Sequence, residues 1–136
     1  HGSAPILWYV GGGASTYKYF SGGTWRTDGL WHNIVLIIDR TTIGNSKMYI
    51  DKVEISGWTT SGSSSMVLND LHLGVNPPSN NFYEGDMDEV ALWNRELNAT
   101  EIETIYDSTN DNPGKCANLF TGGLGTDLVF WNRMGD

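Results

Sequence analysis

The chain has 136 residues with 8 basic and 16 acidic side chains, which gives a formal net charge of −8. Nucleic-acid binding normally needs a basic face that displaces counterions from phosphates, so this acidic balance argues against such a partner. Apolar runs such as residues 34–38 are far shorter than the ~20 residues of a membrane-spanning helix, which argues against membrane insertion. The single cysteine, Cys116, excludes an internal disulfide. One domain with a core of its own is expected.

The first half of the chain is expected to be β-structure. Short apolar runs separated by Gly, Ser and Thr are typical of an antiparallel sandwich or barrel. Strands are expected at residues 5–10, 16–20, 31–39, 46–51 and 53–55. The hairpin turn at residues 51–52 would ordinarily prefer Asp-Gly, because both central residues of such a turn need positive φ. Lys52 is therefore an unusual residue for this position.

The second half is expected to add strands and one short helix. A polar loop is predicted at residues 56–65, strands at 71–75 and 87–93, a loop at 76–80, a linker at 107–114 and a last strand at 128–136. Asn98 and Glu101 have the spacing of a capping box, and apolar residues follow at helical intervals. The pattern predicts a helix of one or two turns from residue 99 to about residue 107.

Four motifs follow one another along the chain: a Trp-His pair, a Lys-x-Tyr-x-Asp hairpin, a Leu-x-x-Gly strand and a closing Gly-x-Met-Asp-Glu-Val segment, found at residues 31–32, 47–51, 71–74 and 82–97. In this order they resemble the motifs of the laminin-G-like, concanavalin A-like lectin/glucanase superfamily. The resemblance implies an all-β, two-sheet antiparallel jelly-roll-like sandwich with one short C-terminal helix. The chain departs from the pattern at Lys52, where relatives have Gly, and in lacking most of the N-terminal strands.

The resemblance also suggests how the chain is divided. Residues 1–107 are expected to form one laminin-G-like unit with its N-terminal strands truncated, and residues 108–136 a linker and a strand that resembles the start of a following unit. That last strand is expected to pair either with its own domain or with another copy. Tandem units of this style look like those of marine bacteriophage virion proteins and large bacterial surface proteins, which implies an extracellular or virion-surface location.

The family resemblance implies a non-catalytic adhesion or carbohydrate-recognition module whose partner is a glycan or cell-surface polysaccharide. Aromatic rings in loops are the candidates for contact, since a ring stacks on the apolar face of a sugar. Ligand contacts are expected at Trp25, Trp58, Phe82 and Tyr83. Trp31, Trp93 and Trp131 have apolar strand neighbours and are expected in the core. A purely structural domain that packs against neighbouring domains or subunits stays open, as does a homo-oligomer.

The acidic residues allow two further interpretations. Calcium prefers six to eight oxygen ligands, and the candidates for such a site are Asp28, Asp70, Glu84 and Asp86. These side chains are equally well explained as solvated loop carboxylates. Glu84 and Glu89 also match the spacing of the retaining glucanases of this superfamily, in which one carboxylate attacks the sugar and the other protonates the leaving group. A glycoside hydrolase is therefore the enzymatic alternative.

The histidines carry no metal-site pattern. His32 and His72 have no Cys or His partner at the spacing of a metal site. Both are expected on strand surfaces.

Overall fold

The computed structural model of the chain describes residues 10–11, 17–19, 29–56, 59–61, 71–76, 81–110 and 117–134. Its strands are β1 (Val10–Gly11), β2 (Tyr17–Tyr19), β3 (Ile34–Ile37), β4 (Lys47–Ile50), β5 (Val53–Glu54), β6 (Thr59–Ser61), β7 (Val75–Asn76), β8 (Asn81–Phe82), β9 (Val90–Trp93) and β10 (Leu128–Asn132). A 3-10 helix, η2, spans Ile43–Asn45, and the α-helix α1 spans Ala99–Asn110. None of the described helices is long and apolar enough to cross a membrane.

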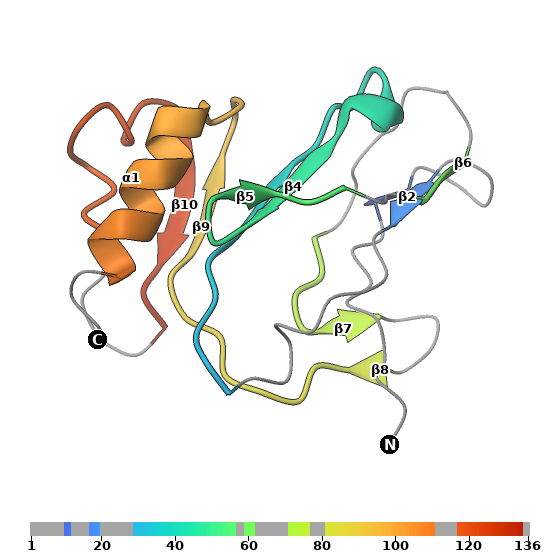
Figure 1. Cartoon of the computed structure of the whole chain (residues 1–136), viewed down its shortest axis with the longest axis horizontal. Helices are drawn as coiled ribbons and strands as arrows, with labels where there is room; N and C mark the ends of the chain where they lie inside the picture. Colours follow the sequence, from blue (N-terminus) through green and yellow to red (C-terminus); the bar gives the residue numbers. More distant parts are fainter. Residues whose placement is uncertain are drawn as a thin grey trace.

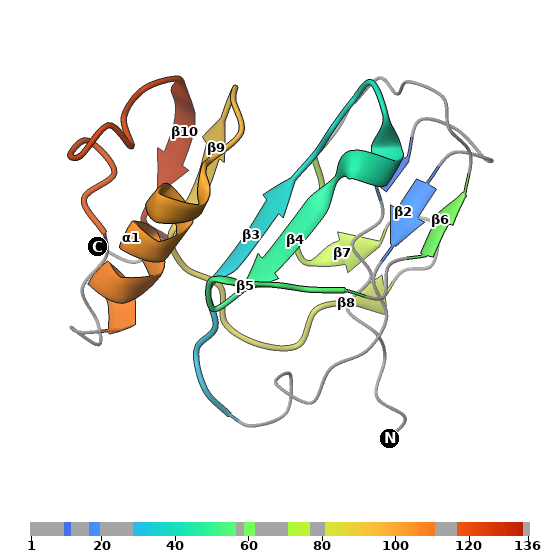
Figure 2. The ribbon, with the colours of Figure 1, turned by 45° about the horizontal axis from the view of Figure 1, so that its top comes forward.

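The described strands form four small antiparallel sheets. Their orders are β1-β2-β6, β3-β4-β5, β7-β8 and β9-β10. In both overall views α1 lies with β9 and β10 at one end, β3 to β5 lie in the middle, and β2, β6, β7 and β8 lie at the other end (Figures 1 and 2). A mostly β domain with one short helix is therefore confirmed. The assembly of these strands into a two-sheet jelly roll stays a prediction.

The hairpin β3-β4 is the structural centre of the domain. Its register places Ile34 opposite Ile50 and Leu36 opposite Met48. Met48 and Ile50 are buried and alternate with half-buried neighbours, as the period-two pattern predicts. One face packs against the main core, and the other forms a smaller cluster around Met48 and Ile50. Both faces of the central strand are thus covered, as expected of a strand that is apolar on both sides.

The turn between β4 and β5 uses two non-glycine residues in the left-handed region. Asp51 has φ 49° and Lys52 has φ 62°, so the hairpin has the positive φ values that this turn needs. The Lys52 Nζ contacts Glu103 at 3.2 Å and Asp107 at 2.9 Å, both on α1. Hydrogen bonds to Asp107 and Glu103 raise the pKa of Lys52 above its usual value. Lys52, which stands where the resembling motif has Gly, therefore connects the β4-β5 turn to α1.

The helix α1 begins with the predicted capping box. The Glu101 backbone N–H donates to Asn98 Oδ1 at 3.0 Å, and the Asn98 N–H donates to Glu101 Oε2 at 2.9 Å. The helix continues to Asn110, so residues 107–110 are helical and their assignment to a linker was wrong. Burial of Ile102 and Ile105 and the ion pair of Asp107 stabilise this longer helix.

Two strands begin later than predicted because local backbone conformation interrupts them. Gly74 has φ 71° and Glu89 has φ 54°, and neither value is compatible with extended strand. As a result β7 begins only at Val75 and β9 only at Val90. The predicted loop at 56–65 contains β6, which pairs with β2. The short strand β8, which pairs with β7, was not predicted from the sequence.

The main core lies between α1, the β9-β10 pair and the segment that precedes β10. Its buried residues are Leu97, Ile102, Ile105, Ala117, Leu119 and Leu124. Trp93 and Trp131 pack against this core, as expected. Trp31 is 69% exposed, so its assignment to the core was wrong. It precedes β3 in an irregular segment and therefore lies outside the alternation that buries the strand residues.

The last strand pairs within its own chain. β10 runs antiparallel to β9, with Trp131 opposite Ala91 and Phe130 opposite Leu92, and a bulge interrupts the register near Val129. The sequence left open whether this strand pairs with its own domain or with another copy. In the structure it pairs with β9 of its own domain.

Candidate ligand-binding surface

Two of the four aromatic residues expected to contact a ligand are consecutive in the chain, and both are exposed. Phe82 ends β8 with 71% of its area exposed, and Tyr83 follows with 52% exposed. Trp25 and Trp58 lie outside the described residues. The sequence prediction for Phe82 and Tyr83 is consistent with this exposure, because a sugar-stacking ring must be open to solvent.

Small residues position the Tyr83 side chain. The Tyr83 backbone N–H donates to the Gly74 carbonyl at 2.8 Å, which joins the residue to the β7 side of the hairpin. A Cβ atom on Gly85 would lie 2.7 Å from the Tyr83 hydroxyl oxygen, so the phenol lies directly against the Gly85 backbone. A Cβ atom on Gly74 would lie 3.0 Å from the methyl carbon of Met87. The Tyr83 ring therefore packs against the Gly85 backbone, in space that the Cβ atom of any other residue would occupy.

Two of the four candidate calcium ligands lie in the described part of the chain. Glu84 and Asp86 are exposed in the loop that follows Tyr83, whereas Asp28 and Asp70 lie outside the described residues. In the described parts of the chain, no group of three or more His, Cys, Asp or Glu residues is placed to hold a metal ion. Any calcium ion bound by Glu84 and Asp86 would need further ligands from elsewhere.

The two candidate catalytic carboxylates have different surroundings. Glu84 is exposed in the loop, and residues 83–89 do not form a strand. Glu89 is half-buried: its Oε2 accepts a hydrogen bond from Trp131 Nε1 at 2.7 Å, and its Oε1 lies 3.4 Å from Arg133 Nε. The Arg133 guanidinium also lies over the Trp131 ring, 5.7 Å from the ring centre. Glu89 thus joins the start of β9 to β10, a role that its spacing does not reveal.

A second long-range contact was missed at the sequence level. His32 Nδ1 lies 2.6 Å from Asp51 Oδ2, and Asp51 Oδ1 accepts a hydrogen bond from the Asn33 backbone N–H at 2.9 Å. The His32 side chain is only 13% exposed, so its expected place on a strand surface was wrong. The pair connects the entry of β3 to the turn after β4. No spacing rule predicts it, because the two residues are 19 positions apart.

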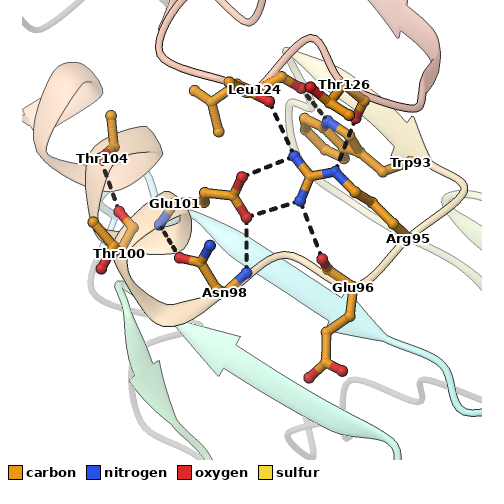
Figure 3. A network of polar contacts seen from close by, with 10 residues as sticks. Trp93, Arg95, Glu96, Asn98, Thr100, Glu101, Thr104, Leu124 and Thr126 are labelled. Carbon is orange, nitrogen blue, oxygen red and sulfur yellow. Dashed lines mark hydrogen bonds and ion pairs between the residues drawn. The ribbon is translucent and has the colours of Figure 1, made fainter.

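The densest polar network lies between β9, α1 and the loop before β10 (Figure 3). Arg95 donates two bonds of 2.8 Å to the two carboxylate oxygens of Glu101. It also donates to the carbonyls of Thr126, Glu96 and Gly123 at 2.9, 3.1 and 3.2 Å. The Arg95 guanidinium lowers the pKa of Glu101 below its usual value, partial burial opposes this effect, and the bond from the Asn98 N–H supports it. Among the described residues, the partners of Arg95 are Glu101 and backbone carbonyls, so we assign this network to stabilisation of the fold.

The match to a family model decides the relationship that the motifs suggested. The model of the concanavalin A-like lectin/glucanases superfamily matches residues 1–103 of this chain. The chain belongs to this superfamily. No curated protein and no solved structure matches it significantly.

The superfamily match ends inside α1, and the structure continues the same domain beyond it. Arg95 and Glu101 lie within the matched residues, whereas Gly123 and Thr126, which accept bonds from Arg95, follow it. Trp93 Nε1 likewise donates to the Leu124 carbonyl at 2.6 Å. In this member of the concanavalin A-like superfamily, the described residues 117–134 therefore pack as part of the domain.

A groove lies beside β10 in this C-terminal part. It has a volume of about 640 Å³ and is lined by four consecutive residues of the strand, 128–131, together with Arg133 and the segment that includes Phe120. Phe120 and Trp131 meet edge to face with their ring centres 5.3 Å apart. None of these lining residues was expected as a site, because Trp131 was expected in the core and residues 128–136 were expected to form a strand that resembles the start of a following unit.

Proposed function

We propose that this domain is a non-catalytic carbohydrate-recognition module that uses Phe82 and Tyr83 to stack on a glycan. The observation that carries the proposal is the exposure of two consecutive aromatic residues at the end of β8, in a domain of the concanavalin A-like lectin/glucanase superfamily. Support of Tyr83 by Gly85 reduces the conformational freedom lost on binding. The net charge of −8 favours a neutral or cationic glycan over a polyanion.

The proposal includes the expectations that belong with such a module. Trp25 and Trp58 are proposed as further contacts, and calcium as an ion that Asp28, Asp70, Glu84 and Asp86 would bind near the rings. The proposed setting is an adhesion protein on an extracellular or virion surface. Because this fold supports many functions, these details depend on the site and not on the family alone.

The experiment is a glycan array followed by calorimetric titration of the strongest binder. Tyr83→Ala and Phe82→Ala are expected to weaken binding about tenfold each, equivalent to ~1.4 kcal/mol. The matched control is Phe120→Ala, which removes a ring of similar exposure, 75% against 71% for Phe82, from the segment that precedes β10. Unchanged affinity in both ring variants, or equal loss in the control, would contradict the proposal. Titration with and without calcium tests the ion.

The glycosidase alternative is less well supported by the geometry. Retaining hydrolysis needs two carboxylates facing one glycosidic bond, with a separation of ~5 Å. Glu89 instead uses both oxygens for contacts with Trp131 and Arg133. Release of reducing ends from β-glucans by the wild-type chain, abolished in both Glu84→Gln and Glu89→Gln, would establish the enzymatic function in place of recognition alone.

A further inference from the structure

The strand β10 presents a backbone edge that no described strand covers. Its sheet has two strands, and β9 occupies one side of β10. Isolated two-stranded sheets are marginal, and an open strand edge is a template for pairing with another chain. Two of the usual protective devices are absent from β10, since Leu128–Asn132 contains no charge and no proline, and the bulge near Val129 leaves residues 130–132 in regular pairing with β9. The edge is therefore suited to strand addition.

The side chains along this edge are apolar and exposed. Val129 is 64% exposed and Phe130 is 49% exposed, and Leu92, opposite Phe130 on β9, is 45% exposed. The groove of about 640 Å³ is lined by four consecutive residues of β10, by Arg133 and by Ala117, Asn118 and Phe120 of the preceding segment, so open space adjoins the strand. An extended segment seated there would gain main-chain hydrogen bonds from the edge and cover the apolar side chains.

The charges at the two ends of β10 are compatible with a second copy of the strand. Asp127 precedes the strand and Arg133 follows it; both are exposed, and Arg133 Nε lies 3.4 Å from Glu89 Oε1 of its own chain. In an antiparallel pair of two β10 strands related by a two-fold axis at Phe130, Asp127 of each copy lies opposite Arg133 of the other. Val129 then faces Trp131, and the two Phe130 residues meet at the axis. A two-fold interface must be self-complementary, and this register satisfies that requirement in charge and in apolar character.

We propose that a second copy of this chain docks its β10 antiparallel to β10 at this edge, which forms a continuous β9-β10-β10-β9 sheet. The dimer is independent of glycan recognition, because β8, which ends at Phe82, lies at the opposite end of the molecule from β10 (Figures 1 and 2). Pairing of two copies would present two carbohydrate surfaces on one particle, and multivalent display raises avidity without a new contact.

The first test compares one substitution on two edge strands. Val129→Lys places a charge on the proposed interface, and Val53→Lys makes the same change on β5, where the valine is 62% exposed against 64% for Val129. Sedimentation equilibrium of the wild-type chain is expected to show a dimer. Val129→Lys is expected to raise the dimer dissociation constant at least about tenfold, equivalent to ~1.4 kcal/mol, while Val53→Lys leaves it unchanged. A monomeric wild type, or equal effects of the two variants, would overturn the proposal.

The second test fixes the register. In a Cys116→Ser background, Phe130→Cys places one thiol from each copy at the two-fold axis, within the ~4.4–6.8 Å Cα separation that a disulfide requires. Asn132→Cys is the control, because its thiols lie on opposite sides of the axis. Mild oxidation is expected to crosslink the first variant into covalent dimers and not the second. Equal crosslinking of both, or of neither, would show that β10 does not pair in this register.

Discussion

Arg95 and Glu101 form a two-bond ion pair in which both N–H···O distances are 2.8 Å. Their side chains are 21% and 15% exposed, so the pair is shielded from most of the solvent. Glu101 is also the acceptor of the capping box, and Arg95 also binds three backbone carbonyls. One ion pair therefore joins the segment after β9, the start of α1 and the loop before β10.

Replacement of Arg95 by Met is expected to lower the free energy of unfolding by ~2–3 kcal/mol, or ~10 °C in melting temperature. The reason is that Glu101 and the carbonyls of Thr126 and Gly123 lose their charged donor. Thermal melting followed by circular dichroism measures the change. Lys47→Met is the control, since its pair with Glu96 is 3.5 Å long and exposed and is expected to contribute less than ~1 kcal/mol. Similar losses in both variants would contradict the role assigned to Arg95.

The same pair predicts a pH dependence of stability. Because the pKa of Glu101 is lower in the folded state, its ionised form contributes stability above the unfolded pKa of ~4.3, and this stability is lost as the pH falls through the lower folded value. Glu101→Gln is expected to be less stable than the wild type at pH 7. The difference in melting temperature should shrink steadily below about pH 4. A difference that stays constant down to pH 2.5 would show that Glu101 does not act through its charge.

The helix start and the central hairpin could be predicted because their signals are local. Asn98 and Glu101 lie three residues apart, and Met48 and Ile50 follow the two-residue period of a strand. The partners of Glu89 and His32 could not be predicted, because Trp131 and Asp51 are 42 and 19 positions away and only the folded chain brings them together. Spacing alone therefore suggested a catalytic role for a glutamate that the structure uses to join two strands.

The lysine at the β4-β5 turn is expected to show opposing effects that salt can separate. Lys52 is strained by its φ of 62°, but it gains contacts with Glu103 and Asp107. Lys52→Gly removes both the strain, which costs ~1 kcal/mol, and the contacts. At low salt the variant is expected to match the wild type, whereas in 1 M NaCl, where the exposed pairs are screened, it is expected to be more stable.

Lys52→Ala is the matched variant for this prediction. It removes the same charges but keeps a Cβ atom in the left-handed region, so it is expected to be less stable than Lys52→Gly at every salt concentration. Chemical denaturation in low and high salt measures both variants. Equal stability of the Gly and Ala variants would show that the backbone at position 52 is not strained.

Gly85 offers a way to move the Tyr83 ring without removing it. An added Cβ atom would lie 2.7 Å from the Tyr83 hydroxyl oxygen, so Gly85→Ala must displace the phenol from its place against the backbone. Since Tyr83 is 52% exposed, the ring can move into solvent, and the melting temperature is expected to change by less than ~2 °C. Glycan affinity is expected to fall severalfold, because the ring is no longer held in place for stacking.

Gly44→Ala is the control for Gly85→Ala, because it makes the same exposed substitution at a position where an added Cβ atom meets nothing within 4 Å. Titration with the glycan that binds the wild type compares the two variants. Loss of affinity in Gly85→Ala alone would show that the orientation of Tyr83, and not only its presence, determines binding. Unchanged affinity in Gly85→Ala would mean that the position of the ring against Gly85 has no part in recognition, whatever Tyr83→Ala shows.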